Sequence, residues 1–155
     1  MAVLLSAESK CVSHHVGALI VRDGRIISSG INGTPPGLPN CCDVFNKDIF
    51  DRAKHSIWSD DNEIHAEMNS LMFSARHPVE VEGCDMYTTL SPCNECLKNI
   101  SMTGIKNVYY LYAYDRIQFN KALLEKVNVQ EVPNATELKK WVEKFDLLYI
   151  PKQRK

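Results

Sequence analysis

Two short runs of metal-binding residue types stand out in the sequence. His65-Ala66-Glu67 sets an imidazole two residues before a carboxylate, and Pro92-Cys93-Asn94-Glu95-Cys96 sets two thiols three residues apart. At the start of a helix this spacing puts both sulfurs on one side, where a single tetrahedral Zn²⁺ can bridge them. With His65 as a third ligand, the fourth position stays open for water, which distinguishes a catalytic zinc from a structural one.

Glu67 lies too close to His65 to be a comfortable second ligand, but it is well placed beside a metal-bound water as a proton carrier. A lone Cys-x-x-Cys is also typical of a structural zinc half-site or a redox pair, and a lone His-x-Glu is uninformative. Together, on two helix starts separated by a strand, the runs match the zinc deaminase motif H-x-E…P-C-x-x-C.

The elements that must position these residues follow from the surrounding pattern. Two β-branched runs flank Asp23-Gly24, which predicts a β-hairpin, and a loop rich in Gly, Pro and Asn follows it. Ile64, Met68 and Leu71 recur at helical spacing, which predicts a helix over 63–76 that Pro78 ends. The polar stretch 44–62 shows no pattern that assigns it to a helix or a strand.

Helices and strands alternate in the rest of the chain. We expect strands over 86–90, 108–112 and 127–132, and helices from Ser91-Pro92, over 117–126 and over 136–145, with Ser91 and Thr136 as caps. This order predicts an α/β fold in which a mixed sheet carries helices on its faces. We expect one domain over 1–155, with 146–155 as a frayed tail.

The composition limits the class of protein. The 155 residues are 45 % hydrophobic and 24 % charged, which is typical of a folded domain. The formal net charge of -1 provides no global basic field that would draw the chain to nucleic acid. No apolar run is long enough for a bilayer and no export signal is visible, so we expect a cytoplasmic protein whose six cysteines bind metal or lie buried.

The chain resembles the cytidine and deoxycytidylate deaminase superfamily, and within it the bacteriophage-type deoxycytidylate (dCMP) deaminases. The resemblance rests on CVSHHVGALIVRDGRIISSGINGTPPGLPNC, NEIHAEMNSLMFSAR and YTTLSPCNECLKNISMTGIKNVYYLYAYD. It implies a cytidine-deaminase-like three-layer α/β/α sandwich with a mixed central sheet. It also implies hydrolysis of dCMP to dUMP and ammonia, and the loop Gly30-Ile31-Asn32-Gly33 favours dCMP as the substrate.

The resemblance implies roles for individual residues in that reaction. Glu67 would take a proton from the water, give one to ring N3 and deliver one to the leaving amine. The backbone of Ala66 and of Ser91 would frame the amide edge and the exocyclic amine of cytosine. Asn32 would bind the base or the sugar, although an Asn before Gly33 is also typical of turn geometry.

A nucleotide substrate also needs a phosphate site, which requires cationic side chains or backbone amides. Arg22 ends the first hairpin strand and Arg116 follows the strand over 108–112, so both are candidates for that site. Tyr114 is a candidate for packing against the nucleotide. Each of these three residues is equally consistent with an ordinary surface or packing role.

Some phage-type relatives hold a second, structural zinc through two cysteines, a histidine and a glutamate. The corresponding positions here are Cys11, Cys41, His55 and Glu63. Cys42 is adjacent to Cys41, so either could be the ligand, and the resemblance favours Cys41. Because Glu63 lies two residues before His65, a metal there would buttress the catalytic helix.

The resemblance also implies regulation. Family members are commonly activated by dCTP and inhibited by dTTP through a site at the subunit contacts of a hexamer. For this chain it therefore implies a homohexamer, in the host cytoplasm if a phage encodes it. Gly30, Gly33 and Arg76 correspond to the regions of control, and Mg²⁺ would accompany the triphosphate effector.

Two alternatives stay open at this point. The first is another deaminase of the superfamily, acting on free cytidine or deoxycytidine, on guanine or on a tRNA adenosine, and the net charge argues mildly against tRNA. The second is a non-enzymatic zinc-binding module. Glu67 argues against that module, because a purely structural zinc needs no general base.

Overall fold

The fold is built on one mixed sheet of five strands in the order β2-β1-β3-β4-β5. The computed structural model describes residues 1–114 and 118–148. β1 pairs antiparallel with β2 and β3, whereas β3, β4 and β5 run parallel to one another. The strand bounds are Gly17–Arg22 (β1), Arg25–Ile31 (β2), Asp85–Leu90 (β3), Asn107–Tyr112 (β4) and Asn128–Glu131 (β5). The predicted mixed sheet is confirmed.

The predicted hairpin is formed by β1 and β2. Its turn residues Asp23 and Gly24 have φ angles of 49° and 73°, so both adopt the left-handed conformation that two-residue hairpin turns require. The pairing shifts by one residue between Ile20 and Val21, which marks an irregularity in the ladder.

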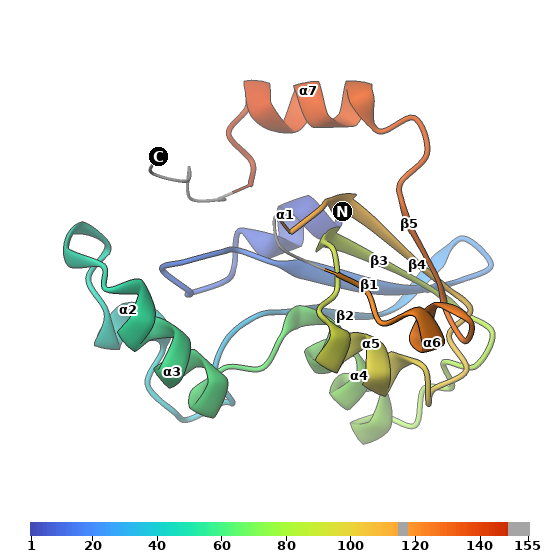
Figure 1. Cartoon of the computed structure of the whole chain (residues 1–155), viewed down its shortest axis with the longest axis horizontal. Helices are drawn as coiled ribbons and strands as arrows, with labels where there is room; N and C mark the ends of the chain where they lie inside the picture. The colour runs from blue at the N-terminus through green and yellow to red at the C-terminus, as the bar shows by residue number, and fades with distance from the viewer. Residues whose placement is uncertain (115–117, 149–155) are drawn as a thin grey trace.

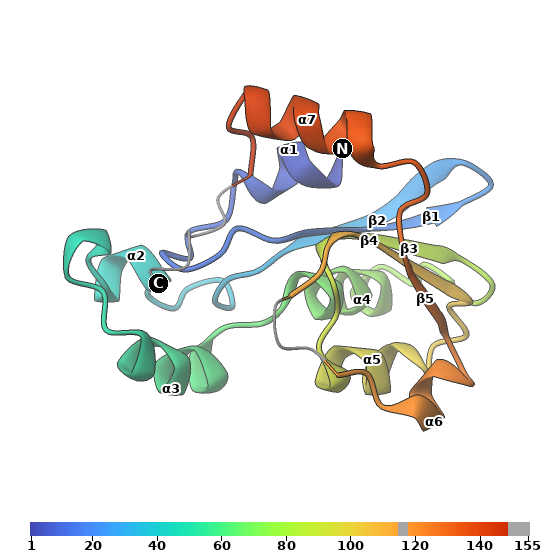
Figure 2. The same cartoon turned by 45° about the horizontal axis from the view of Figure 1, so that its top comes forward.

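Helices cover both faces of the sheet, so the molecule has the predicted three layers (Figures 1 and 2). One face carries α1 (Ala2–Ser6) and α7 (Thr136–Lys144), and the other carries α4 (Ala66–Arg76), α5 (Asn94–Ile100) and the short α6 (Lys121–Leu124). The larger core lies on the α4–α5 side, where Met86, Leu97 and Val108 are fully buried. A smaller cluster that includes Val3, Leu111 and Val142 fills the α1–α7 side.

The stretch 44–62, to which the sequence assigns no element, folds beside the sheet. It contains a 3₁₀ turn over Lys47–Ile49 and the 11-residue helix α3 (Arg52–Asn62). The short helix α2 (Cys41–Val44) precedes it, at the end of the segment predicted as a loop. Asp51 caps α3 by accepting hydrogen bonds from the backbone N–H groups of Ala53 and Lys54. Figure 2 shows α3 at the side of the sheet, on the same side as the beginning of α4.

Several predicted boundaries are corrected. α4 begins at Ala66 instead of residue 63, because Glu63 and His65 have extended backbones. α5 is capped by Cys93 instead of Ser91, whose N–H still belongs to the sheet edge and donates to the carbonyl of Tyr112. α6 is shorter than the predicted 117–126, and α7 is capped at Ala135 instead of Thr136. Among the described residues, no helix is long and apolar enough to cross a membrane.

Candidate active site

Two helix starts bring His65, Cys93 and Cys96 together. His65 precedes the first turn of α4, and Cys93 caps α5 with Cys96 one turn later. The Nδ1 atom of His65 lies 3.3 Å from the sulfur of Cys96 and 3.5 Å from that of Cys93. Two such ligands of one tetrahedral zinc stand about 3.6 Å apart when the Zn–S bond is about 2.3 Å and the Zn–N bond about 2.05 Å. These three side chains therefore fit a zinc ion.

The electrostatics of this cluster favour a thiolate. A hydrogen bond from Cys96 and the neighbouring His65 lower the pKa of the Cys93 thiol to about 3. The same contact with Cys93 raises the pKa of His65 to about 9. The backbone N–H of Cys96 also points at the sulfur of Cys93, as expected where a helix begins at an anionic group. A thiolate at this position is the form that binds metal.

Glu67 stands in the first turn of α4 with a buried side chain, and the whole residue is only 4 % exposed. Burial raises the pKa of its carboxyl above the ordinary value, and the nearby His65 opposes that shift. A carboxyl with a raised pKa next to a metal site is suited to accept and return a proton.

A second cluster gathers Cys11, Cys41, His55 and Glu63, whose candidate ligand atoms all lie within 4.8 Å of one another. The Cys11 sulfur is 3.6 Å from both the Nε2 atom of His55 and the Oε2 atom of Glu63, and those last two atoms are 3.8 Å apart. These spacings also match the ligands of one tetrahedral ion. The chain therefore has four donors at a second site.

The surroundings of the second cluster support a bound cation. The backbone N–H groups of Ser13 and Val12 point at the sulfurs of Cys11 and Cys41, as is usual around metal-bound thiolates. Among the described residues, Oε1 of Glu63 is the buried side-chain nitrogen or oxygen that lacks a hydrogen-bond partner. Because a buried carboxylate oxygen is rarely unpaired, this atom fits a metal ligand.

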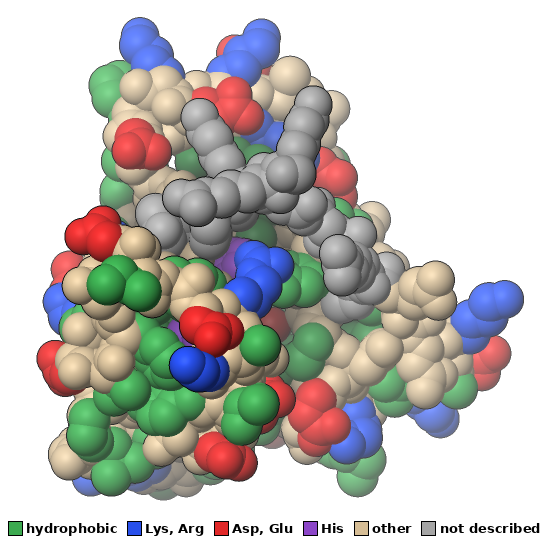
Figure 3. Space-filling model, turned by 60° about the vertical axis from the view of Figure 1, so that its left-hand side comes forward, with side chains coloured by type: hydrophobic (Ala, Val, Ile, Leu, Met, Phe, Trp, Pro, Cys, Tyr) green, Lys and Arg blue, Asp and Glu red, His purple; other side chains and the backbone are tan. Residues whose placement is uncertain are grey.

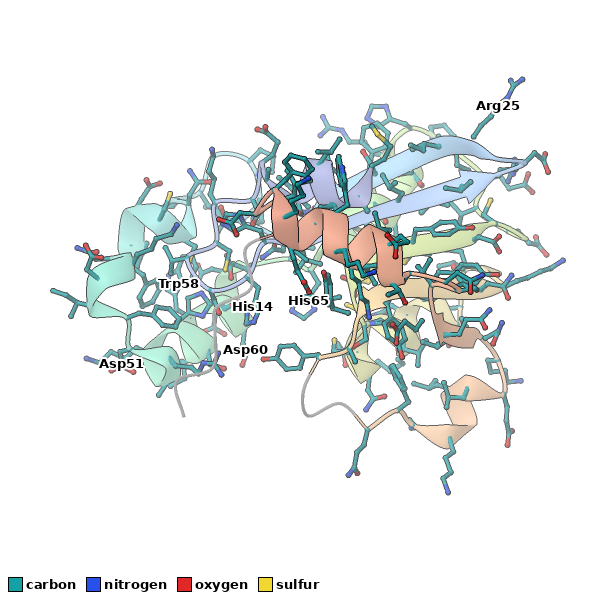
Figure 4. The ribbon with its side chains drawn as sticks, turned by 90° about the horizontal axis from the view of Figure 1, so that it is seen from above. His14, Arg25, Asp51, Trp58, Asp60 and His65 are labelled. Atoms are coloured by element: carbon teal, nitrogen blue, oxygen red, sulfur yellow. The ribbon has the colours of Figure 1, made fainter. Side chains whose placement is uncertain are left out.

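Both clusters open onto one cavity of about 340 Å³. Its walls come from α3, the start of α4, the end of β3 and the segment that precedes β1. Seen from the side of α3, histidine side chains are visible in a hollow with a cationic side chain at its edge (Figure 3). His14, Asp60 and His65 lie near one another around this space (Figure 4). The cavity is large enough to admit a small-molecule substrate.

Four of the predicted substrate contacts line this cavity: Asn32, Ala66, Ser91 and Tyr114. The N–H of Ala66 belongs to the first turn of α4, where a helix supplies no acceptor. Ser91 accepts a hydrogen bond from the N–H of Tyr114 through its hydroxyl.

Asn32 is already used by the fold. Its Oδ1 atom accepts hydrogen bonds from the Ser9 hydroxyl and the Val16 N–H, both at 2.8 Å, and its Nδ2 atom donates to the His14 carbonyl. One Nδ2 hydrogen remains for a ligand. Asn32 therefore fastens the segment that carries Cys11 to the end of β2.

The other predicted residues do not gather here. Arg22 lies at the far end of β1, where its guanidinium donates to the backbone carbonyl of Glu80, so the structure does not bring it to this cavity. β1 runs away from the site, which lies beside the first residue of β1. Arg116 lies outside the described residues.

The residues predicted for regulation surround α4. Gly30 packs against the first turns of α4, where an added Cβ would lie 2.3 Å from the carbonyl oxygen of Ala66. Gly33 pairs with Ile64 in an isolated bridge, and Arg76 is the last residue of α4.

The cavity also contains residues that the sequence motifs do not indicate. His14 stacks edge-on against Tyr114 with ring centroids 5.7 Å apart, and Arg52, Ser56 and Asp60 come from α3. His14 could have been predicted as a cavity residue, because it lies only three residues after the candidate ligand Cys11. α3 had no such signal in the sequence, because its cavity face is polar.

A model of the cytidine and deoxycytidylate deaminase zinc-binding region matches residues 1–112. The chain belongs to the cytidine and deoxycytidylate deaminase family. The resemblance inferred from the two motifs is therefore confirmed, and the family is one of zinc-binding deaminases.

Individual members of the family share much of the chain. The deoxycytidylate deaminase of Enterobacteria phage T4 is 44 % identical over 147 residues, covering 75 % of this chain and 76 % of that protein. ComE operon protein 2 of Bacillus subtilis (strain 168) is 36 % identical over 126 residues, covering 81 % of this deaminase and 63 % of the relative. The dCMP deaminase of cyanophage S-TIM5, crystallised with dCMP and dUMP, superposes with a TM-score of 0.68 at 34 % identity and covers 84 % of this chain and 90 % of that one.

Proposed function

We propose that this chain is a zinc-dependent dCMP deaminase, which hydrolyses dCMP to dUMP and ammonia and so supplies dUMP for thymidylate synthesis. The observation that carries the proposal is the buried carboxylate of Glu67 beside the cluster of His65, Cys93 and Cys96. The identity with the phage T4 deoxycytidylate deaminase and the S-TIM5 complex with dCMP and dUMP support the choice of substrate.

His65, Cys93 and Cys96 would hold the catalytic Zn²⁺. A zinc ion bound by three protein ligands supplies Lewis-acid activation of a water at neutral pH. Glu67 would accept one proton from the attacking water and pass it to ring N3, and would then accept the proton left on the attacking oxygen and deliver it to the departing amine. One carboxylate can make both transfers because it lies buried beside the cluster, where the water and the base would meet.

The cavity walls would orient the pyrimidine. The N–H of Ala66 is available to the carbonyl edge of the base, and the backbone carbonyl of Ser91 to the exocyclic amine. The remaining Nδ2 hydrogen of Asn32 would bind the base or the sugar. Tyr114, half exposed at the cavity and paired with His14, would pack against the nucleotide.

Cys11, Cys41, His55 and Glu63 would hold a second zinc. Four protein ligands close a tetrahedral site to substrate, so this ion would be structural. The buried Cys41, and not the exposed Cys42, belongs to the cluster. Zinc analysis should give two ions per chain for the wild type and for Cys42→Ser, and one for Cys11→Ser. A Cys11→Ser protein that keeps two ions would contradict the second site.

We also propose that dCTP activates and dTTP inhibits the enzyme, each as its Mg²⁺ complex, in a homohexamer located in the cytoplasm of the host. Gly33 supports this, because its bridge to Ile64 would transmit a change in its loop to His65. Gly30 and Arg76 border the same helix α4. Initial rates with each effector, together with sedimentation of the enzyme, test regulation and assembly. Rates that neither effector alters would contradict the regulation.

The decisive experiment compares ammonia release from dCMP and deoxycytidine by the wild type and by Glu67→Gln. The wild type should prefer dCMP, and Glu67→Gln should retain zinc and its melting temperature while losing at least about 100-fold in kcat. Full activity of Glu67→Gln would contradict the mechanism. Equal turnover of deoxycytidine would indicate a nucleoside deaminase, and no turnover of either substrate would favour a non-enzymatic zinc module or a tRNA substrate.

A further inference from the structure

The cavity wall opposite the ligand cluster of His65, Cys93 and Cys96 is one face of α3. Arg52, Ser56 and Ser59 follow one another at spacings of four and three, so they share a side of the helix, and all three line the cavity. Lys54 lies on another side, is 79 % exposed in its side chain and contacts Asp51. α3 thus presents one of its two cations to the site and the other to solvent.

The charges of this cavity are unevenly distributed. Asp60 and Glu63 stand at the C-terminal end of α3, and Asp60 lies on the side towards His65 (Figure 4). Arg52 stands at the other end, and about 16 Å of helix separate it from Glu63 at 1.5 Å per residue. A phosphate dianion is repelled from the acidic end and attracted to the end with Arg52.

A nucleotide matches this polarity, since its reacting amine and its phosphate are at opposite ends of the molecule. When the amine reaches Glu67, the phosphate must point away from His65, Cys93 and Cys96. Among the described residues that line the cavity, Arg52 is the only lysine or arginine. Within the described part of the chain it forms no salt bridge that would compete for its guanidinium.

We propose that Arg52, with the hydroxyl of Ser56 one turn later, binds the 5′-phosphate of the substrate and so makes the enzyme select a nucleotide over a nucleoside. The proposal rests on the proposed dCMP deaminase activity. It gives α3 two functions, because the same helix supplies His55 to the second metal cluster. The guanidinium suits the task, since its planar donors fit two phosphate oxygens at once.

The test compares Arg52→Ala with Lys54→Ala, which removes the same charge from the same helix outside the cavity. Arg52→Ala should raise KM for dCMP about 10- to 100-fold, as expected for a lost charge-assisted hydrogen bond, and leave kcat/KM for deoxycytidine unchanged. Lys54→Ala should match the wild type on both substrates. Arg52→Lys should recover part of the loss, because it keeps the charge but not the bidentate geometry.

Calorimetric binding of dUMP and deoxyuridine provides a second measurement that does not depend on turnover. The wild type should bind dUMP more tightly than deoxyuridine, and Arg52→Ala should abolish that preference. Unchanged dCMP kinetics in Arg52→Ala, or an equal loss on dCMP and deoxycytidine, would overturn the role of Arg52. A wild type that does not deaminate dCMP would instead overturn the proposed function on which this role rests.

Discussion

Gly30→Ala is expected to disturb the active site although Gly30 does not line the cavity. A Cβ added at Gly30 would stand 2.3 Å from the carbonyl oxygen of Ala66 and 2.5 Å from the backbone nitrogen of Ser70. Both atoms belong to the backbone of α4, so no side chain can rotate away to make room. The methyl group can be accommodated only if α4 and β2 move apart.

The size of that movement follows from ordinary contact distances. Non-bonded atoms of this kind approach to about 3.5 Å, so the first turn of α4 must retreat by about 1.2 Å. Overpacking of this kind costs about 1–3 kcal/mol, which lowers Tm by roughly 2–12 °C in a chain of this length. Because the same turn carries Glu67 and follows His65, a shift of 1 Å is also expected to reduce kcat/KM by about 100-fold.

Gly33→Ala is the matched control. It lies three residues further along the chain, but an added Cβ there meets nothing within 4 Å. Thermal melting and dCMP kinetics of the two variants should therefore diverge, with Gly33→Ala close to the wild type. Equal Tm and equal kcat/KM for Gly30→Ala and the wild type would refute the argument that close packing of β2 on α4 positions the catalytic turn.

Two further substitutions test local structure. Asp51→Ala removes the cap of α3 and should lower Tm by a few degrees, whereas Asp51→Asn keeps the cap. Hydrogen bonds from the backbone N–H groups of Lys54 and Ala53 hold the pKa of Asp51 below 3.8, so its stabilisation should persist above that pH and vanish as the pH falls through the lowered pKa. A Tm difference between wild type and Asp51→Ala that is unchanged in strong acid would contradict this. Asn32→Ala leaves buried partners unpaired and should cost about 2–4 kcal/mol in urea unfolding, and a loss below about 1 kcal/mol would contradict the anchoring role.

The sheet and the helices packed on it could be predicted because their residues obey simple periodicities. β1 and β4 are mostly apolar, and α4 turns Leu71 and Met68 towards the core. The hairpin turn follows from Asp23-Gly24 alone. These signals are local, so no knowledge of the tertiary structure is needed to find them.

α3 could not be predicted for a physical reason. Its inward side holds His55, Ser56 and Ser59, because it faces a cavity and a metal cluster instead of a hydrophobic core. Ile57, the aliphatic residue that would suggest an apolar face, is 69 % exposed. A helix whose buried side performs chemistry lacks the apolar stripe by which helices are recognised.

Arg22 shows a different limit of sequence reasoning. Its place at the end of a strand was predicted correctly, but strand order and direction decide which edge of the sheet that end occupies. β1 is antiparallel to β3, so the last residue of β1 lies at the first residues of β3, away from Ser91. The sequence shows that Arg22 is a cation at the end of a strand, but it does not show at which edge of the sheet that strand end lies.

The segment before α4 shows how the position of a helix start decides where the ligand side chains point. Residues 63–65 are extended, so Glu63 and His65 point to the same side and Ile64 to the other. Ile64 pairs with Gly33 through hydrogen bonds of 2.9 and 3.1 Å, which hold this segment against the end of β2. Glu63 then reaches the second cluster while His65 reaches the first. A helix beginning at Glu63 would have turned these two side chains in different directions, so the late start of α4 is what places two ligand clusters on one cavity.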